Sequence, residues 1–207
     1  MKYNSIEEGE NTMAHIELNQ FPIVGISDNI FTANLQIDPT ITNTITRNIK
    51  EGGDKQNRTS NVQAIMTDWN MQKEPGFAEL EKEITDIIHY LPNIIRPNDD
   101  TFHSMMIGNM WGICYKKNDY TKVHDHWPAT WSGTFYLDIP TDYAGTLFFP
   151  ALEHNIEPVT GQLVIFSGDT LHGVKTIQSN GERLAISFNY YVEGQQIQMP
   201  LLGGEKA

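Results

Sequence analysis

The chain has 207 residues, of which 39% are hydrophobic and 19% are charged, and its formal net charge at pH 7 is −12. This length suits one domain with an N-terminal extension, and the apolar content excludes a disordered chain. The negative charge argues against nucleic-acid binding and against a polybasic membrane-surface role, because both depend on many Lys and Arg contacts. The single cysteine, Cys114, excludes an intrachain disulfide and a cysteine-based zinc cluster.

The N-terminal region predicts a loose arm followed by a strand. Residues 1–20 are polar and acidic and contain no apolar run of the kind found in secretory signals. The run Phe21–Val24 is short and apolar, which favours a strand. No run in the chain approaches the ~18 apolar residues that cross a bilayer. Together with the low cysteine content, these features predict a cytoplasmic protein without membrane association.

Two helices are predicted before residue 100. The first spans about residues 39–51, where Asp38 is the expected N-cap and three isoleucines share one face: Ile41, Ile45 and Ile49. The second spans about residues 75–91, with Pro75 at its start, a strong apolar stripe, and Pro92 at its end. We expect these helices to cover one face of a β-sheet.

From about residue 103 the sequence changes to short β-rich runs separated by turn signals. The predicted strands are Met105–Tyr115, Thr121–His124, Trp131–Ile139, Thr146–Phe149, Asn155–Glu157, Gln162–Phe166, Leu171–Thr176 and Arg183–Val192. Short strands at this spacing are typical of a β-sandwich, a jelly roll or a small barrel.

Three of the seven histidines form a pattern that points to a metal site. His124 and His126 are two residues apart in VHDHW, and in an extended segment both side chains point the same way. His172 begins another predicted strand, so it can supply a third ligand from a distant part of the chain. An H-x-H pair alone is more often a polar strand end with no ligand role, so the surrounding residues decide.

The strand that begins at Arg183 predicts a cavity beside these histidines. One face of RLAISFNYY is apolar, whereas the other carries Arg183, Ala185, Ser187 and Asn189. Small polar residues on one face suit the lining of a wet cavity better than an open surface. The strand from Trp131 has a similar polar face, formed by Ser132, Thr134 and Tyr136.

The order H-x-H, His, Arg resembles the Fe(II)/2-oxoglutarate-dependent oxygenases, whose usual motif is H-x-D…H…R. The segment SGTFYLDIPTDYAGTLFFP is similar to that of prolyl-hydroxylase-like members. One branch of this superfamily has the pattern W…H-x-H…SG-x-x-Y…G-x-L-x-F, which this chain resembles at Trp111, His124, His126, Ser132-Gly133, Tyr136 and GQLVIF. The resemblance covers about residues 105–192. It implies a mainly β fold with flanking helices: a double-stranded β-helix (jelly-roll, cupin-like barrel) with N-terminal helices packed on one sheet. The oxygenase domain would then span residues 21–207, with helical support over about 36–100 and a barrel core over about 103–193.

The resemblance also implies the metal ligands. His124 and His172 correspond to the two histidines that bind Fe(II), and His126 stands where the family has its carboxylate. Two histidines and one carboxylate are the usual ligands of non-haem Fe(II) oxygenases. Asp125, between the two histidines, is the alternative third ligand if the segment bends.

The remaining roles follow from the same resemblance. Arg183 would bind the distal carboxylate of 2-oxoglutarate, a task suited to a planar guanidinium. Tyr115 and Tyr136 would hydrogen-bond this cosubstrate, and Ser187 and Asn189 would line the pocket.

The implied activity is hydroxylation of a small-molecule or peptide substrate by O2, with release of succinate and CO2. The alternative is a cupin-like metalloprotein, an isomerase or a cosubstrate-independent dioxygenase, that uses a three-histidine site. A cupin would place a glutamate three or four residues after His126, where this chain has Ala129 and Thr130.

Overall fold

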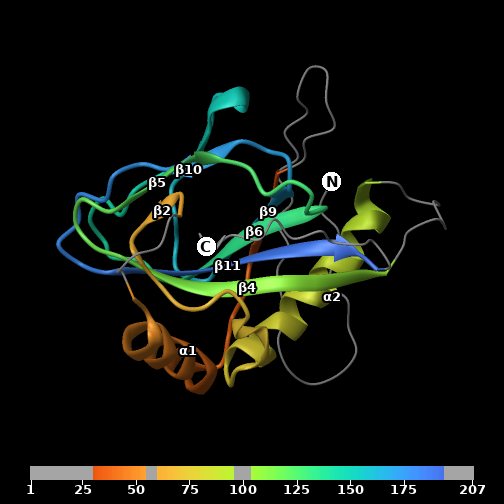
Figure 1. Cartoon of the computed structure of the whole chain (residues 1–207), viewed down its shortest axis with the longest axis horizontal. Helices are drawn as coiled ribbons and strands as arrows, with labels where there is room; N and C mark the ends of the chain where they lie inside the picture. The colour runs from red at the N-terminus through yellow and green to blue at the C-terminus, as the bar shows by residue number, and fades with distance from the viewer. Residues whose placement is uncertain (1–29, 55–59, 96–103, 194–207) are drawn as a thin grey trace, which may run out of the picture.

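The structure, a computed structural model, describes residues 30–54, 60–95 and 104–193 (Figure 1). Two antiparallel sheets face each other, a larger one ordered β1-β9-β6-β11-β4-β3 and a smaller one ordered β2-β5-β10-β7-β8. The arm predicted over residues 1–20 and the strand predicted at Phe21–Val24 lie outside the described residues. The elements in chain order are β1 (Ile30–Asn34), α1 (Pro39–Gly52), β2 (Val62–Gln63), β3 (Ile65–Met66), η1 (Met71–Lys73), α2 (Phe77–Ile95), β4 (Met105–Tyr115), β5 (Tyr120–His124), β6 (Trp131–Asp138), β7 (Leu147–Phe149), η2 (Pro150–Leu152), β8 (His154–Ile156), β9 (Gln162–Ser167), β10 (His172–Val174) and β11 (Arg183–Val192).

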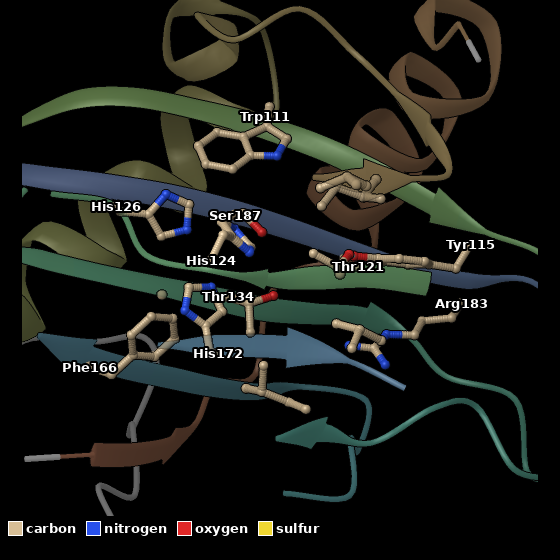
Figure 2. Close-up of a pocket in the computed structure, with 16 residues that line it drawn as sticks. Trp111, Tyr115, Thr121, His124, His126, Thr134, Phe166, His172, Arg183 and Ser187 are labelled. Atoms are coloured by element: carbon tan, nitrogen blue, oxygen red, sulfur yellow. The ribbon is translucent and has the colours of Figure 1, made fainter. Parts of the chain in front are cut away.

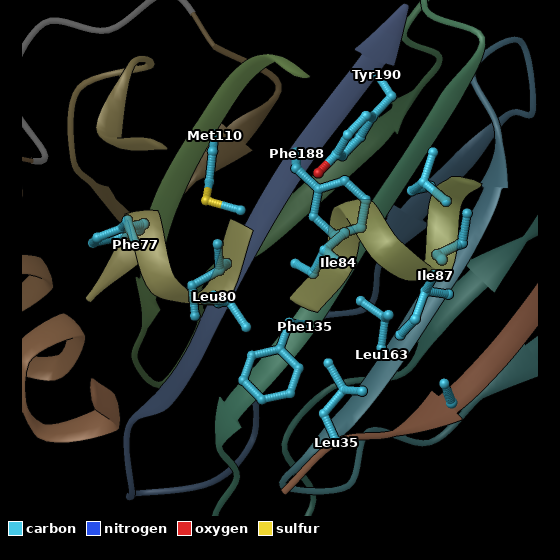
Figure 3. Packing of buried hydrophobic residues seen from close by; sticks show 14 of the residues in the cluster. Leu35, Phe77, Leu80, Ile84, Ile87, Met110, Phe135, Leu163, Phe188 and Tyr190 are labelled. Carbon is cyan, nitrogen blue, oxygen red and sulfur yellow. The ribbon is translucent and has the colours of Figure 1, made fainter. Parts of the chain in front are cut away.

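The large sheet separates two hydrophobic layers because its strands alternate between them. On β11, Leu184, Ile186, Phe188 and Tyr190 pack toward the helices, as the sequence predicted. The intervening residues face the small sheet, where a second apolar cluster includes Ala185. Figure 3 shows the first layer, in which α2 places Leu80 and Ile84 against the side chains of the large sheet. The space between the two sheets therefore holds the polar residues of β11, Arg183 and Ser187, beside this second apolar cluster.

Both predicted helices form, with corrections at the second. Asp38 caps α1, since its carboxylate accepts a hydrogen bond from the Thr40 amide at 2.7 Å. Helix α2 begins at Phe77, because Gly76 has a φ of +84° and cannot belong to a helix. It continues through Pro92 to Ile95, although the Pro92 nitrogen has no proton to donate. Within the described chain, neither helix is long and apolar enough to cross a membrane.

The eight strands predicted after residue 103 are all present with small shifts at their ends, and the structure adds three strands that were not predicted. Strand β1 extends the large sheet by pairing with β9, over the register Ile30↔Phe166 to Asn34↔Gln162. Strands β2 and β3 have two residues each and pair with β5 and β4. Two residues are too few to show any periodicity, so such strands are fixed by their partners.

The contact between α1 and the large sheet gives a test of this packing. A Cβ added at Gly112 on β4 would lie 2.3 Å from Cγ1 of Ile49 and 3.2 Å from Phe77. Gly112→Ala is therefore expected to lower the free energy of unfolding by about 1–3 kcal/mol in urea denaturation. Gly52→Ala is the control, because nothing lies within 4 Å of a Cβ there. Equal stability of the two variants would contradict the close approach of α1 to β4.

Candidate metal centre

Two of the predicted ligands are direct partners across neighbouring strands. His172 on β10 pairs with His124 on β5, and their ring centroids are 4.5 Å apart. His126 follows β5 in a segment fastened to the β9–β10 turn, where its amide donates to the Gly168 carbonyl at 2.7 Å. One nitrogen from each histidine lies within 4.8 Å of the other two. The structure therefore brings together the three histidines that the sequence selected (Figure 2).

Backbone carbonyls orient two of the three rings. The Nδ1 atoms of His124 and His172 lie 2.8 Å from the Lys122 carbonyl and 2.9 Å from the Thr170 carbonyl. A carbonyl only accepts, so each Nδ1 carries the proton and each Nε2 keeps a lone pair. Such a bond on the non-coordinating nitrogen is the usual support of a metal-binding histidine.

Burial keeps the cluster uncharged. Desolvation, followed by repulsion from His124, lowers the pKa of His172 to about 3. Desolvation also lowers the pKa of His126 well below its usual value, with further contributions from the other two histidines. Desolvation also lowers the pKa of His124, although the hydrogen bond to the Lys122 carbonyl and the charge of Asp125 oppose this shift. Neutral imidazoles are the form that binds a metal ion.

The alternative ligand, Asp125, is engaged with its own turn. Its side chain is exposed, and one carboxylate oxygen accepts a hydrogen bond from the Trp127 amide at 3.1 Å. The group of possible ligands among the described residues consists of the three histidines without a carboxylate. Three imidazoles suit Fe, Cu, Ni or Zn, so the donor set is compatible with iron but not specific for it.

Arg183 lies in the same pocket, buried and without a counter-charge. Its side chain is 1% exposed, and the guanidinium lies between the rings of Tyr115 and Tyr136, 5.1 Å and 5.0 Å from their centroids. One terminal nitrogen, Nη1, donates to the carbonyls of Ala144 and Gly145, whereas Nε has no partner. No carboxylate of the described chain forms an ion pair with Arg183.

The two tyrosines keep their protons in this setting. Burial raises the pKa of Tyr136 to about 12 and also raises the pKa of Tyr115, with Arg183 opposing both shifts. The Tyr115 hydroxyl lies 2.7 Å from the Thr121 hydroxyl. Both phenols are therefore neutral groups that can donate a hydrogen bond beside the guanidinium.

The other two predicted pocket residues, Ser187 and Asn189, differ in their positions. Ser187 lines the pocket, whereas Asn189 does not. The Asn189 amide is instead occupied within the sheet, accepting from Ser132 at 2.6 Å and donating to Asn109 at 2.7 Å.

Several lining residues were not predicted as site residues. Thr134 could have been found, because it lies on the polar face of β6 that the sequence had already indicated. Trp111 stands in the motif that carries the family resemblance, but no role was assigned to it. Thr121 and Phe166 gave no signal, since side chains of this kind also fill ordinary cores.

The fold matches a set of solved structures, although no family model and no curated protein matches the sequence. The chain is similar to the viral collagen prolyl hydroxylase from Paramecium Bursaria Chlorella virus-1 in a 2-oxoglutarate complex, with 20% identity, a TM-score of 0.57, and coverage of 79% of this chain and 96% of that one. It is similar to a Pseudomonas putida prolyl-4-hydroxylase, with 16% identity, a TM-score of 0.60, and coverage of 80% and 93%. A third neighbour is a Trichoplax adhaerens prolyl hydroxylase in complex with a hypoxia inducible factor peptide fragment, with 15% identity, a TM-score of 0.52, and coverage of 79% and 84%.

These likenesses show the fold. The chain has the double-stranded β-helix fold of these neighbours, as the sequence resemblance implied, with a three-histidine cluster between its sheets.

Metal binding tests the cluster itself. The wild-type protein is expected to bind one divalent ion such as Co(II) per chain, measured by equilibrium dialysis and by the visible spectrum of the bound ion. His172→Ala should lose this binding, because two imidazoles remain. His154→Ala, a histidine outside the cluster, should keep it. Equal metal content in the two variants would show that the ion binds elsewhere.

Proposed function

We propose that the protein is a non-haem Fe(II)- and 2-oxoglutarate-dependent oxygenase that hydroxylates a small-molecule or peptide substrate and releases succinate and CO2. The observation that carries this proposal is the pairing, in one pocket, of three neutral imidazoles with a buried guanidinium that forms no ion pair with any described residue. The fold is consistent with it, because the structural neighbours are prolyl hydroxylases.

The buried guanidinium favours an anionic ligand. Burying a charge is costly unless it is paired, and a guanidinium carries a full positive charge. Its two aromatic neighbours and two backbone carbonyls stabilise the cation only in part. A carboxylate reaching this end of the pocket would supply the missing negative charge and accept from the unpartnered Nε.

The histidine end of the pocket favours the other half of the same ligand. Three neutral ligands leave a divalent ion with its full charge of +2, whereas one carboxylate ligand would reduce it to about +1. Together with Arg183, the pocket would then hold three positive charges and no carboxylate of its own. A dicarboxylate that chelates the ion at one end and reaches Arg183 at the other offsets most of this charge.

The protein's own part in the reaction is placement and exclusion of water. When bound, Fe(II) with 2-oxoglutarate supplies the oxidation of a substrate C–H bond by O2. The Lys122 and Thr170 carbonyls hold two of the imidazoles, and Phe166 and Phe149 pack against His172, with ring centroids 4.5 Å and 6.2 Å away. Tyr115 and Tyr136 offer neutral donors beside Arg183. No side chain is required to act as a general base.

A second candidate is favoured by the absence of a carboxylate ligand. A three-histidine metalloprotein that needs no cosubstrate, such as a cupin-like dioxygenase or isomerase, would use the same cluster. That function assigns no task to a buried guanidinium in the same pocket.

The neighbour in complex with a peptide fragment supports a peptide substrate over a small metabolite.

The role of Arg183 separates the two candidates. Under anaerobic conditions, wild-type protein loaded with Fe(II) is expected to bind 2-oxoglutarate and to develop a visible charge-transfer band. Arg183→Gln should keep the iron but weaken 2-oxoglutarate binding by about a hundredfold, because a charge-assisted pair is worth roughly 1.5–3 kcal/mol and its loss leaves a buried carboxylate unpaired. Arg183→Lys, which keeps the charge but loses the planar fork, should bind with intermediate affinity.

Two outcomes would contradict the proposal. If the iron-loaded protein binds no 2-oxoglutarate, the second candidate, a three-histidine metalloprotein that needs no cosubstrate, is favoured. If Arg183→Gln binds it as tightly as the wild-type protein does, Arg183 has another purpose.

A further inference from the structure

The polar residues that face the space between the sheets lie in rows across β4, β11 and β6. Toward one end of these strands, Asn109, Asn189 and Ser132 are directly opposite one another and satisfy one another through two hydrogen bonds. Toward the other end, Arg183 is opposite Tyr115, whose hydroxyl is bonded to Thr121. Both of these rows therefore have partners within the protein for much of their polar surface.

The row between them is different. Ser187 on β11 is directly opposite Trp111 on β4 and Thr134 on β6, and all three line the pocket. The Trp111 side chain is 2% exposed, and its indole nitrogen has no hydrogen-bond partner. Thr134 is 8% exposed, and neither its hydroxyl nor that of Ser187 takes part in any hydrogen bond of the described structure. We call Trp111, Ser187 and Thr134 the donor row.

The donor row lies at the histidine end of the pocket. The Trp111 ring is 6.0 Å from the His126 ring, and Figure 2 shows Trp111, Ser187 and Thr134 around the same space as the three histidines. Arg183 precedes Ser187 by four residues, which is about 13 Å along a strand. The row and the guanidinium therefore serve opposite ends of whatever ligand fills the pocket.

The chemistry of the row selects an oxygen-rich ligand. An indole N–H can only donate, and hydroxyl groups can donate as well as accept. The Trp111 indole nitrogen is fully buried without a partner, and the half-buried Ser187 and buried Thr134 face the same cavity. Leaving a buried donor unpaired is unfavourable, so this set indicates a ligand with acceptor atoms. The aromatic neighbour Trp69, whose ring centroid is 4.6 Å from that of Trp111, packs against the indole and limits its movement.

We propose that the donor row binds the carboxylate oxygens of the ligand at its metal-bound end. This inference rests on the proposed function for the identity of that ligand, 2-oxoglutarate. It adds that the two carboxylates of a dicarboxylate are stabilised at separate places. Arg183 would bind the far carboxylate, and three neutral hydrogen-bond donors would bind the carboxylate beside the metal. Binding of a short carboxylate at the metal would then depend on the donor row but not on Arg183.

Oxalate separates the two ends, because it chelates a metal but has no distal carboxylate. Co(II)-loaded protein would be titrated with oxalate and with 2-oxoglutarate, following the visible spectrum of the bound ion. Trp111→Phe, Ser187→Ala and Thr134→Val should each weaken both ligands, on the order of tenfold for a hydrogen bond to a charged group. Arg183→Gln should weaken 2-oxoglutarate alone. Ser132→Ala is the matched control, since this buried serine lies on the same strand as Thr134 in the internally bonded row.

The outcomes distinguish this inference from the proposed function. Unchanged oxalate affinity in all three donor-row variants, with metal content equal to that of the wild-type protein, would overturn the role of the row. If the donor-row variants bind oxalate more weakly but the wild-type protein does not bind 2-oxoglutarate, the role of the donor row is supported and the proposed cosubstrate is wrong. A donor-row variant that loses the metal would assign that residue to the support of the cluster and overturn its proposed role.

Discussion

A buried positive charge that no carboxylate of the described residues neutralises is the constraint on which the site depends. Arg183 is held between two tyrosine rings at the start of β11, and no acidic side chain of the described protein reaches it. An isolated charge in such a place is tolerated when the surrounding structure is stable enough to carry its cost, and a ligand can then recover that cost on binding. The rest of the pocket is consistent with this, because its described lining residues include donors and neutral imidazoles but no carboxylate.

Each of the two sheets supplies a different part of this site. The small sheet supplies the His124–His172 pair by direct cross-strand register, and the following turn adds His126. The large sheet supplies the guanidinium and the donors from one face, while its other face packs against α1 and α2. Because the helices stabilise the sheet from outside, the inner face can carry polar groups that an ordinary core would exclude. Burial between the sheets also keeps the imidazoles neutral, through the lowered pKa values of His126 and His172.

Much of this could be predicted from the sequence, for identifiable physical reasons. Strict alternation along RLAISFNYY separated the helix-facing residues from the pocket-facing ones, and the structure confirms the division at Leu184 and Ala185. The convergence of the three histidines was also predicted, because the i, i+2 spacing and the later strand restrict the possible arrangements. Asn189 shows what alternation cannot predict. It lies on the expected face of the strand, but its side-chain amide is hydrogen-bonded to Ser132 and Asn109. Strand periodicity gives the face of a residue and not its hydrogen-bond partners, and for the same reason it did not mark Trp111 as part of the site.

The central claim is that one ligand bridges the histidine cluster and Arg183. A crystal structure of the protein grown anaerobically with Fe(II) and 2-oxoglutarate, with the metal located by its anomalous scattering, tests this claim most directly. The account predicts one ion bound by the Nε2 atoms of His124 and His172 and by His126, and a dicarboxylate running from that ion to the guanidinium. An ion bound elsewhere, or a dicarboxylate that leaves Arg183 without a contact, would contradict it.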